Sequence, residues 1–71
     1  MSQFTRAYAA EELLAVFGDQ ATALSPDQFG RATTAVIELA KARDISVMGA
    51  VELIRRGLAP QTLADYADAT V

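Results

Sequence analysis

The most informative stretch of the sequence is Ser25-Pro26-Asp27-Gln28-Phe29. A serine followed three residues later by glutamine forms a capping box, in which each side chain bonds a backbone N–H group that the helix start leaves unpaired. Proline is favoured at the first helical position, and an acidic residue beside it interacts favourably with the positive end of the helix. The stretch therefore predicts that a helix begins at Pro26.

Apolar residues follow this start at helical spacing, which predicts one buried face on a helix that continues to about Ala42. We expect this helix to be central in the fold. The residues of its predicted buried face are Phe29, Ala32, Val36, Leu39 and Ala40.

One helix is predicted before the central one. It runs from about Gln3 to Phe17 and ends at Gly18-Asp19, because glycine readily terminates a helix. Its predicted buried stripe is Ala10, Leu13, Leu14 and Phe17. The small and polar segment 20–24 is interpreted as a linker.

Two shorter helices are predicted after the central one. Ser46 can cap a helix from Val47 to Arg56, which Gly57 then ends. Pro60 suits the first turn of a last helix, whose apolar stripe is Leu63, Tyr66 and Ala67. The sequence thus predicts an all-α protein, a single helical domain over residues 1–71, folded as a small bundle of about four short helices.

The composition predicts that part of the apolar surface meets another chain. Apolar residues make up 52% of the 71 residues and charged residues only 21%. A chain of this length buries only about 60% of the surface that its unfolded form exposes. A homodimer is the simplest way to cover the rest, because one self-complementary patch extends the core of both copies.

Several chemistries are excluded by residue types that the chain lacks. Cysteine and histidine are both absent, which removes disulfides, thiolate chemistry, Cys–His zinc sites and Ser–His pairs. The carboxylate pairs Glu11-Glu12 and Asp65-Asp68 have no third ligand at metal-binding spacing. We therefore expect no enzyme activity, with no catalytic, cofactor-binding or metal-binding residue and no small-molecule substrate.

The chain also lacks the patterns of a secretory signal and of a membrane span. Glu11 and Glu12 interrupt the N-terminal region, and no run of about 20 apolar residues occurs. These features predict a cytoplasmic protein without membrane partners.

One segment carries a recognisable order of residues. Leu39-Ala40 is followed by a short corner with Ile45-Ser46 and then by Ala50 and Leu53. This order, over about Val36–Gly57, resembles the helix-turn-helix domain family of DNA-binding proteins. The resemblance implies that the predicted second and third helices form a helix-turn-helix-like pair, packed at a steep angle with apolar residues on both inward faces.

The sequence departs from the family pattern in the turn. Asp44 occupies the position where glycine is usual, and Arg43 stands where an apolar residue is common. Aspartate adopts the left-handed conformation more readily than most residues, so a turn at Asp44 remains feasible.

The predicted third helix favours a protein partner over DNA. If Ala50, Leu53 and Ile54 face inward, then Val47, Met48 and Val51 face outward. Valine and methionine read few base edges, and Glu52 would repel phosphate.

We therefore expect a small regulatory or adaptor protein that binds another protein or itself. The predicted protein-binding residues are Val47, Met48, Val51 and Glu52, with Arg55 at the rim. On this interpretation, Val51→Asp abolishes association and leaves the helical signal intact.

The alternative is a DNA-binding transcriptional regulator. Its predicted contacts are Lys41, Arg43, Ser46, Arg55 and Arg56, which cluster around the turn and the third helix. A net charge of −3 opposes attraction to phosphate backbones. Four of the six basic residues of the chain also have an acidic residue one helical turn earlier, which predicts ordinary surface pairing, by the pairs Asp27–Arg31, Glu38–Lys41, Glu52–Arg55 and Glu52–Arg56.

Overall fold

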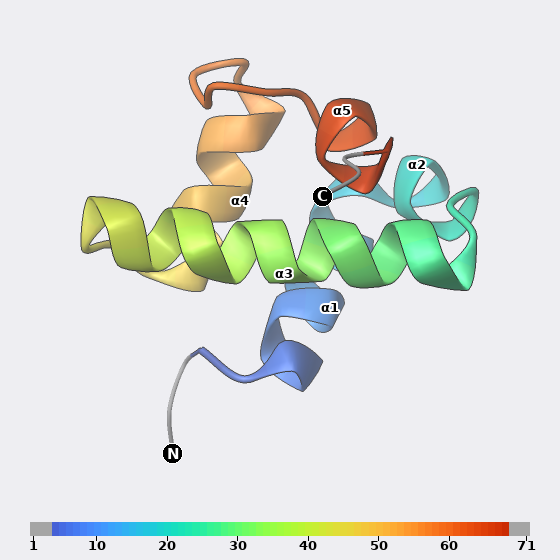
Figure 1. Cartoon of the computed structure of the whole chain (residues 1–71), viewed down its shortest axis with the longest axis horizontal. Coiled ribbons are helices and arrows are strands. Elements are labelled where there is room, and N and C mark those ends of the chain that lie inside the picture. The colour runs from blue at the N-terminus through green and yellow to red at the C-terminus, as the bar shows by residue number, and fades with distance from the viewer. Residues whose placement is uncertain (1–3, 69–71) are drawn as a thin grey trace.

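The computed structural model describes residues 4–68, and within that range all regular secondary structure is helical, with no strand. Its five helices are α1 (Arg6–Phe17), α2 (Asp19–Thr22), α3 (Pro26–Arg43), α4 (Val47–Arg55) and α5 (Leu63–Asp68). The all-α prediction is confirmed, with one helix more than the expected number. Figure 1 shows α3 running across the molecule, with α1 crossing it and α4 and α5 packed on the same side of it.

The capping box that starts α3 is formed. The Ser25 hydroxyl accepts a hydrogen bond from the Gln28 backbone N–H at 3.1 Å, and the Ser25 N–H donates to Gln28 Oε1 at 2.8 Å. Pro26 occupies the first turn. The prediction of this helix start is confirmed. It could be made from the sequence because Ser25, Pro26 and Gln28 lie within four consecutive positions.

The corner between α3 and α4 also follows the prediction. Asp44 takes the left-handed conformation, with φ 54° and ψ 47°, and its N–H donates to the carbonyls of Ala40 and Lys41. The Ser46 hydroxyl then caps α4 by accepting from the Gly49 N–H at 3.0 Å. This short corner turns the chain so that α4 rises steeply from the end of α3 (Figure 1).

Three boundaries differ from the prediction. Segment 20–24 is not only a linker, because Asp19–Thr22 forms α2 and buries Ala21. α1 begins at Arg6, since the Thr5 hydroxyl caps it by accepting from the Tyr8 N–H, and the predicted start at Gln3 lies outside the described residues. α5 begins at Leu63 and not at Pro60, because the Thr62 hydroxyl caps it through the Asp65 N–H.

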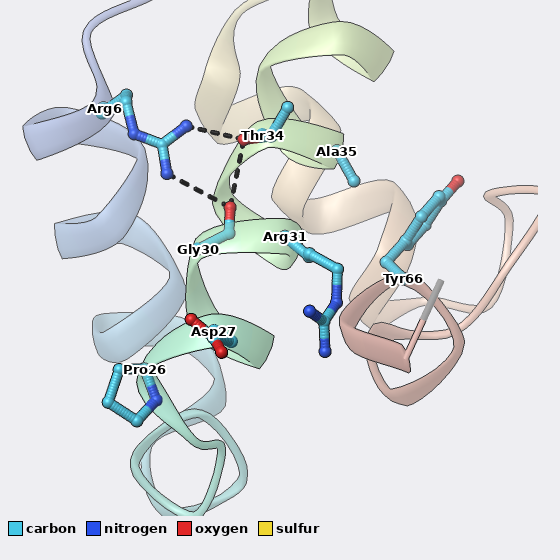
Figure 2. Close-up of a pocket in the computed structure, with 8 residues that line it drawn as sticks. All are labelled: Arg6, Pro26, Asp27, Gly30, Arg31, Thr34, Ala35 and Tyr66. Carbon is cyan, nitrogen blue, oxygen red and sulfur yellow. Dashed lines mark hydrogen bonds between the residues drawn. The ribbon is translucent and has the colours of Figure 1, made fainter. Parts of the chain in front are cut away.

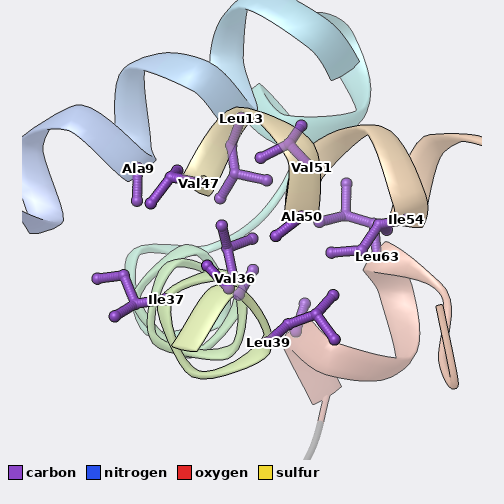
Figure 3. Packing of buried hydrophobic residues seen from close by; sticks show 13 residues of the cluster. Ala9, Leu13, Val36, Ile37, Leu39, Val47, Ala50, Val51, Ile54 and Leu63 are labelled. Carbon is purple, nitrogen blue, oxygen red and sulfur yellow. The ribbon is translucent and has the colours of Figure 1, made fainter. Parts of the chain in front are cut away.

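One hydrophobic core joins the four longer elements (Figure 3). The stripe predicted for α1 is partly wrong: Leu13 is fully buried, but Ala9 takes the place of Ala10, and Leu14 is 43% exposed. On α5, Leu63 and Ala67 are buried as predicted. The core residues are Ala9 and Leu13 of α1, Ala32, Val36, Ile37, Leu39 and Ala40 of α3, Val47, Ala50, Val51 and Ile54 of α4, and Leu63 and Ala67 of α5.

The total surface is that of an ordinary monomer. The chain exposes 4427 Å², close to the roughly 4,200 Å² that the size scaling of compact monomers gives for this mass. Of the 37 apolar residues in the sequence, 15 are alanine. Alanine raises the apolar fraction without adding large apolar patches, so the high fraction by itself is no argument for a second chain.

Candidate protein-binding surface

The surface predicted on α4 is largely inside the protein. Val47 and Val51 are both 0% exposed, so the expectation that they face outward is wrong. Met48, in contrast, is 51% exposed, as predicted. Figure 3 shows Val47 and Val51 among the core side chains near Leu13 of α1.

Helical spacing explains this correction. The buried residues of α4 are Val47, Ala50, Val51 and Ile54, which recur at the intervals of three and four residues that place side chains on one helix face. The inward set predicted from the helix-turn-helix resemblance contained Leu53 in place of the two valines. Leu53 is only half-buried, because α1 packs over the valine side of α4.

The exposed remainder of the predicted surface is a narrow stripe. It consists of Met48, Glu52 and Arg55, which lie one and two turns apart on the outward side of α4. Met48 is the only large apolar side chain in this set. The stripe therefore offers one apolar anchor beside an ion pair.

Glu52 engages both arginines that follow it. Arg55 donates from Nε and Nη2 to the two carboxylate oxygens at 2.8 Å each, and Arg56 Nε donates to Oε1 at 3.3 Å. These contacts, above all the hydrogen bonds from Arg55, lower the pKa of Glu52 from 4.5 to about 2. Glu52 thus partly neutralises two of the cations assigned to DNA in the alternative hypothesis.

The other residues of that alternative are placed as follows. Lys41 and Arg43 are exposed near the end of α3, and the Lys41 ammonium lies 5.9 Å from the centroid of the Phe4 ring. The Ser46 hydroxyl is engaged as the cap of α4. Two of the outward positions expected on the predicted third helix, Val47 and Val51, are covered within the protein itself.

A shallow groove of about 470 Å³ lies over α3, between the first turn of α1 and α5. Its lining combines apolar surface from Pro26, Ala35 and Tyr66 with two guanidinium groups, those of Arg6 and Arg31. Figure 2 shows Arg6 reaching from α1 onto α3 on one side and Arg31 extending toward α5 on the other. The remaining lining residues are Asp27, Gly30 and Thr34.

Both arginines of the groove are held by neutral acceptors. Arg6 donates from Nη1 to the Thr34 hydroxyl at 2.6 Å and from Nη2 to the Gly30 carbonyl at 3.2 Å. Arg31 donates from Nε to the Ala67 carbonyl at 2.7 Å. The predicted Asp27–Arg31 pair is not among the ion pairs of residues 4–68.

A second, smaller hollow of about 310 Å³ adjoins the groove, because Pro26 belongs to the lining of both. It is almost entirely apolar, and its lining includes Leu14, Leu24 and Phe29. Leu14, one of the three large apolar side chains that are exposed in residues 4–68, therefore borders a concave surface.

Neither a metal centre nor a membrane span is found in the part of the chain that the structure describes. No three acidic side chains in residues 4–68 gather as ligands for one ion. No helix in this range has the length and apolar character needed to cross a bilayer.

Comparisons with known proteins identify no relative. No protein-family model matches the chain, and neither a curated protein nor a solved structure matches it.

The sequence prediction missed the groove because its residues come from three separate helices. Arg6 and Arg31 are 25 positions apart, and Tyr66 lies a further 35 positions along the chain. One signal was available, since Arg6 has no acidic residue three or four positions away from it. A cation without a local partner is free to contact another element, as Arg6 does with α3.

Proposed function

We propose that this chain is a small helical adaptor or regulatory protein that acts by binding another protein and performs no catalysis of its own. The groove over α3 is its binding surface, in place of the α4 surface predicted from sequence. The single observation that supports this assignment is the pairing of two positioned arginines with an apolar groove floor.

The composition of the groove is typical of a protein interface. Arginine and tyrosine are enriched among residues that dominate binding energies, and they act best where neighbouring groups hold them in place. Arg6 and Arg31 meet this condition through hydrogen bonds to α3 and α5. The α4 stripe has Met48 as its only apolar anchor, and the guanidinium of Arg55 already bonds Glu52.

Two observations on α4 rank protein binding ahead of the DNA-binding alternative. α1 covers Val47 and Val51 of α4, and Glu52 places a carboxylate between Arg55 and Arg56. A DNA reader would need α4 accessible to the major groove and free cations beside it. Titration of labelled random duplex DNA at low and at higher salt tests this ranking, because phosphate binding is strongly salt-dependent.

Homodimerisation is one form that the proposed protein binding can take. Light scattering of the purified chain over a range of concentrations separates it from binding to a different protein. A monomeric mass throughout the range directs the search to a heterologous partner.

The proposed surface is tested with two matched substitutions on α3. Ala35→Glu introduces a carboxylate into the groove, whereas Ala42→Glu places the same group two turns later on an exposed site outside it. In quantitative affinity capture from a cell extract, we expect partners retained by the parent chain and Ala42→Glu to be lost with Ala35→Glu. Partners retained equally by all three chains, but lost with Met48→Asp, would move the binding surface back to α4.

A further inference from the structure

The free N–H groups of the groove point to an anionic ligand. Arg6 uses one N–H of each terminal nitrogen, and Arg31 uses only its Nε–H, so each guanidinium keeps further donors without an acceptor among residues 4–68. The acceptors that hold the two groups are neutral, so neither positive charge is cancelled by an ion pair within this range. Carboxylates are natural partners for such donors, because arginine binds them with strong charge-assisted hydrogen bonds.

The local charge of the groove is opposite to that of the chain. Two guanidinium groups outweigh the carboxylate of Asp27, while the protein as a whole carries −3. Asp27 lies in the first turn of α3, where the helix dipole favours an acidic side chain. An acidic ligand is therefore attracted to the groove and repelled by much of the remaining surface.

The apolar parts of the lining favour a peptide segment over a small free anion. Ala35 and Tyr66 provide apolar contact beside the arginines, and Pro26 leads from the groove into the apolar hollow beside Leu14. A small anion would use the guanidinium groups and leave this surface uncovered. A peptide can place a carboxylate on the arginines and an apolar side chain in the neighbouring hollow.

We infer that the groove binds an acidic segment of the partner protein, in which an Asp or Glu carboxylate accepts from Arg6 or Arg31 and a nearby apolar side chain packs against the hollow at Leu14. This inference rests on the proposed function and specifies the chemistry of the partner. The apolar contacts provide area, and the two arginines provide selectivity for acidic residues.

Selection from a library of random dodecapeptides displayed on phage tests this chemistry directly, because it requires no identified partner. We expect peptides enriched on the full chain to share an Asp or Glu next to an apolar residue. Replacing that acid by its amide in a labelled peptide should weaken binding about tenfold or more, the usual effect of losing a hydrogen bond to a charged group. Selection on Arg31→Glu should replace the acidic preference by a basic one.

Matched controls separate a binding effect from a folding effect. Arg31→Glu also removes the bond to Ala67, so each variant is first checked for an unchanged helical circular dichroism spectrum. Ala35→Glu should abolish binding of the enriched peptides by offering the arginines an internal carboxylate. Ala42→Glu should leave that binding unchanged.

Each other outcome overturns the inference in a distinct way. Enriched peptides without an acidic preference that still lose binding with Ala35→Glu would refute the acidic ligand but keep the groove as a protein-binding surface. No enrichment, or peptides unaffected by Ala35→Glu, would refute both the inference and the proposed surface. Binding of a labelled single-stranded oligonucleotide that depends on Ala35, without any acidic peptide, would replace the peptide by a nucleic acid.

Discussion

Val51→Ala provides a direct test of the orientation of α4. Val51 is 0% exposed, whereas Met48, less than one turn before it, is 51% exposed. Met48→Ala is therefore a matched control on the same helix. If α4 is oriented as described, truncation at Val51 destabilises the fold and truncation at Met48 has little effect.

The expected loss at Val51 follows from three contributions. Removing two buried carbon atoms costs about 1.6 kcal/mol of transfer free energy. The cavity left behind adds roughly 1 kcal/mol, and the higher helix propensity of alanine offsets about 0.6 kcal/mol. The net loss is about 2 kcal/mol from a total stability of roughly 4–10 kcal/mol for a domain of this length.

Thermal unfolding followed by far-ultraviolet circular dichroism measures this loss. A decrease of about 2 kcal/mol should lower Tm by roughly 8–16 °C in a domain of this size, whereas Met48→Ala should change stability by less than about 0.5 kcal/mol. Equal shifts for the two variants would refute the orientation of α4. Val51→Asp should lose the cooperative helical signal altogether, because a carboxylate at this buried position is strongly unfavourable. The interpretation of the sequence expected the opposite, a Val51→Asp variant with an intact helical signal.

Three further predictions concern local features. Ser25→Ala removes the capping box and should lower the free energy of unfolding in urea by about 1 kcal/mol, while Ser25→Gly should lower it by only a few tenths; equal losses would show that the hydroxyl is not the cause. Asp44→Gly should raise the free energy of unfolding by up to about 1 kcal/mol and Asp44→Ala should lower it, because only glycine adopts φ 54° without a side-chain penalty; a gain with alanine would contradict the left-handed turn. The Glu52 carboxyl should titrate with a pKa near 2 by NMR, and this pKa should rise toward 4.5 in Arg55→Gln. Because the folded state lowers the pKa, the contribution of this ion pair to stability is complete above pH 4.5 and is lost as the pH falls toward 2. A pKa that does not change in Arg55→Gln would exclude the hydrogen bonds from Arg55 as the cause of the lowered value.

The features of the fold that the sequence predicted are those set by neighbouring residues. Ser25 and Gln28 specify the start of α3 by direct hydrogen bonds, and Asp44 and Ser46 specify the corner in the same way. Each of these interactions spans only three or four positions. The all-α class and the central α3 follow from such local signals together with apolar periodicity.

The orientation of α4 was predicted wrongly because two apolar faces were available on one short helix. Met48 and Leu53 flank a stripe of four buried residues, so almost every face of α4 carries an apolar side chain. Only the packing of α4 against α1 and α3 determines that Val47 and Val51 are covered. The spacing of three and four residues between the two valines, Ala50 and Ile54 was a better guide to the buried face of α4 than the helix-turn-helix resemblance.

The groove could not be predicted because it depends on how the helices pack. Arg6 is placed by the contact of α1 with α3, and Tyr66 by the docking of α5 on α3. Arg31 was assigned to a surface pair with Asp27 from its spacing, yet it bonds the carbonyl of Ala67. The structure therefore changes the predicted binding surface while leaving protein binding as the proposed function.

The most direct test of the proposed binding surface is an NMR footprint of the captured partner, or of an enriched acidic peptide, on the isotopically labelled chain. We predict that backbone shifts and slowed amide exchange concentrate at Arg6, Gly30, Thr34 and Ala35, with little change at Met48. Changes concentrated along α4 at Met48 and Glu52, with the α3 groove unaffected, would contradict the proposal.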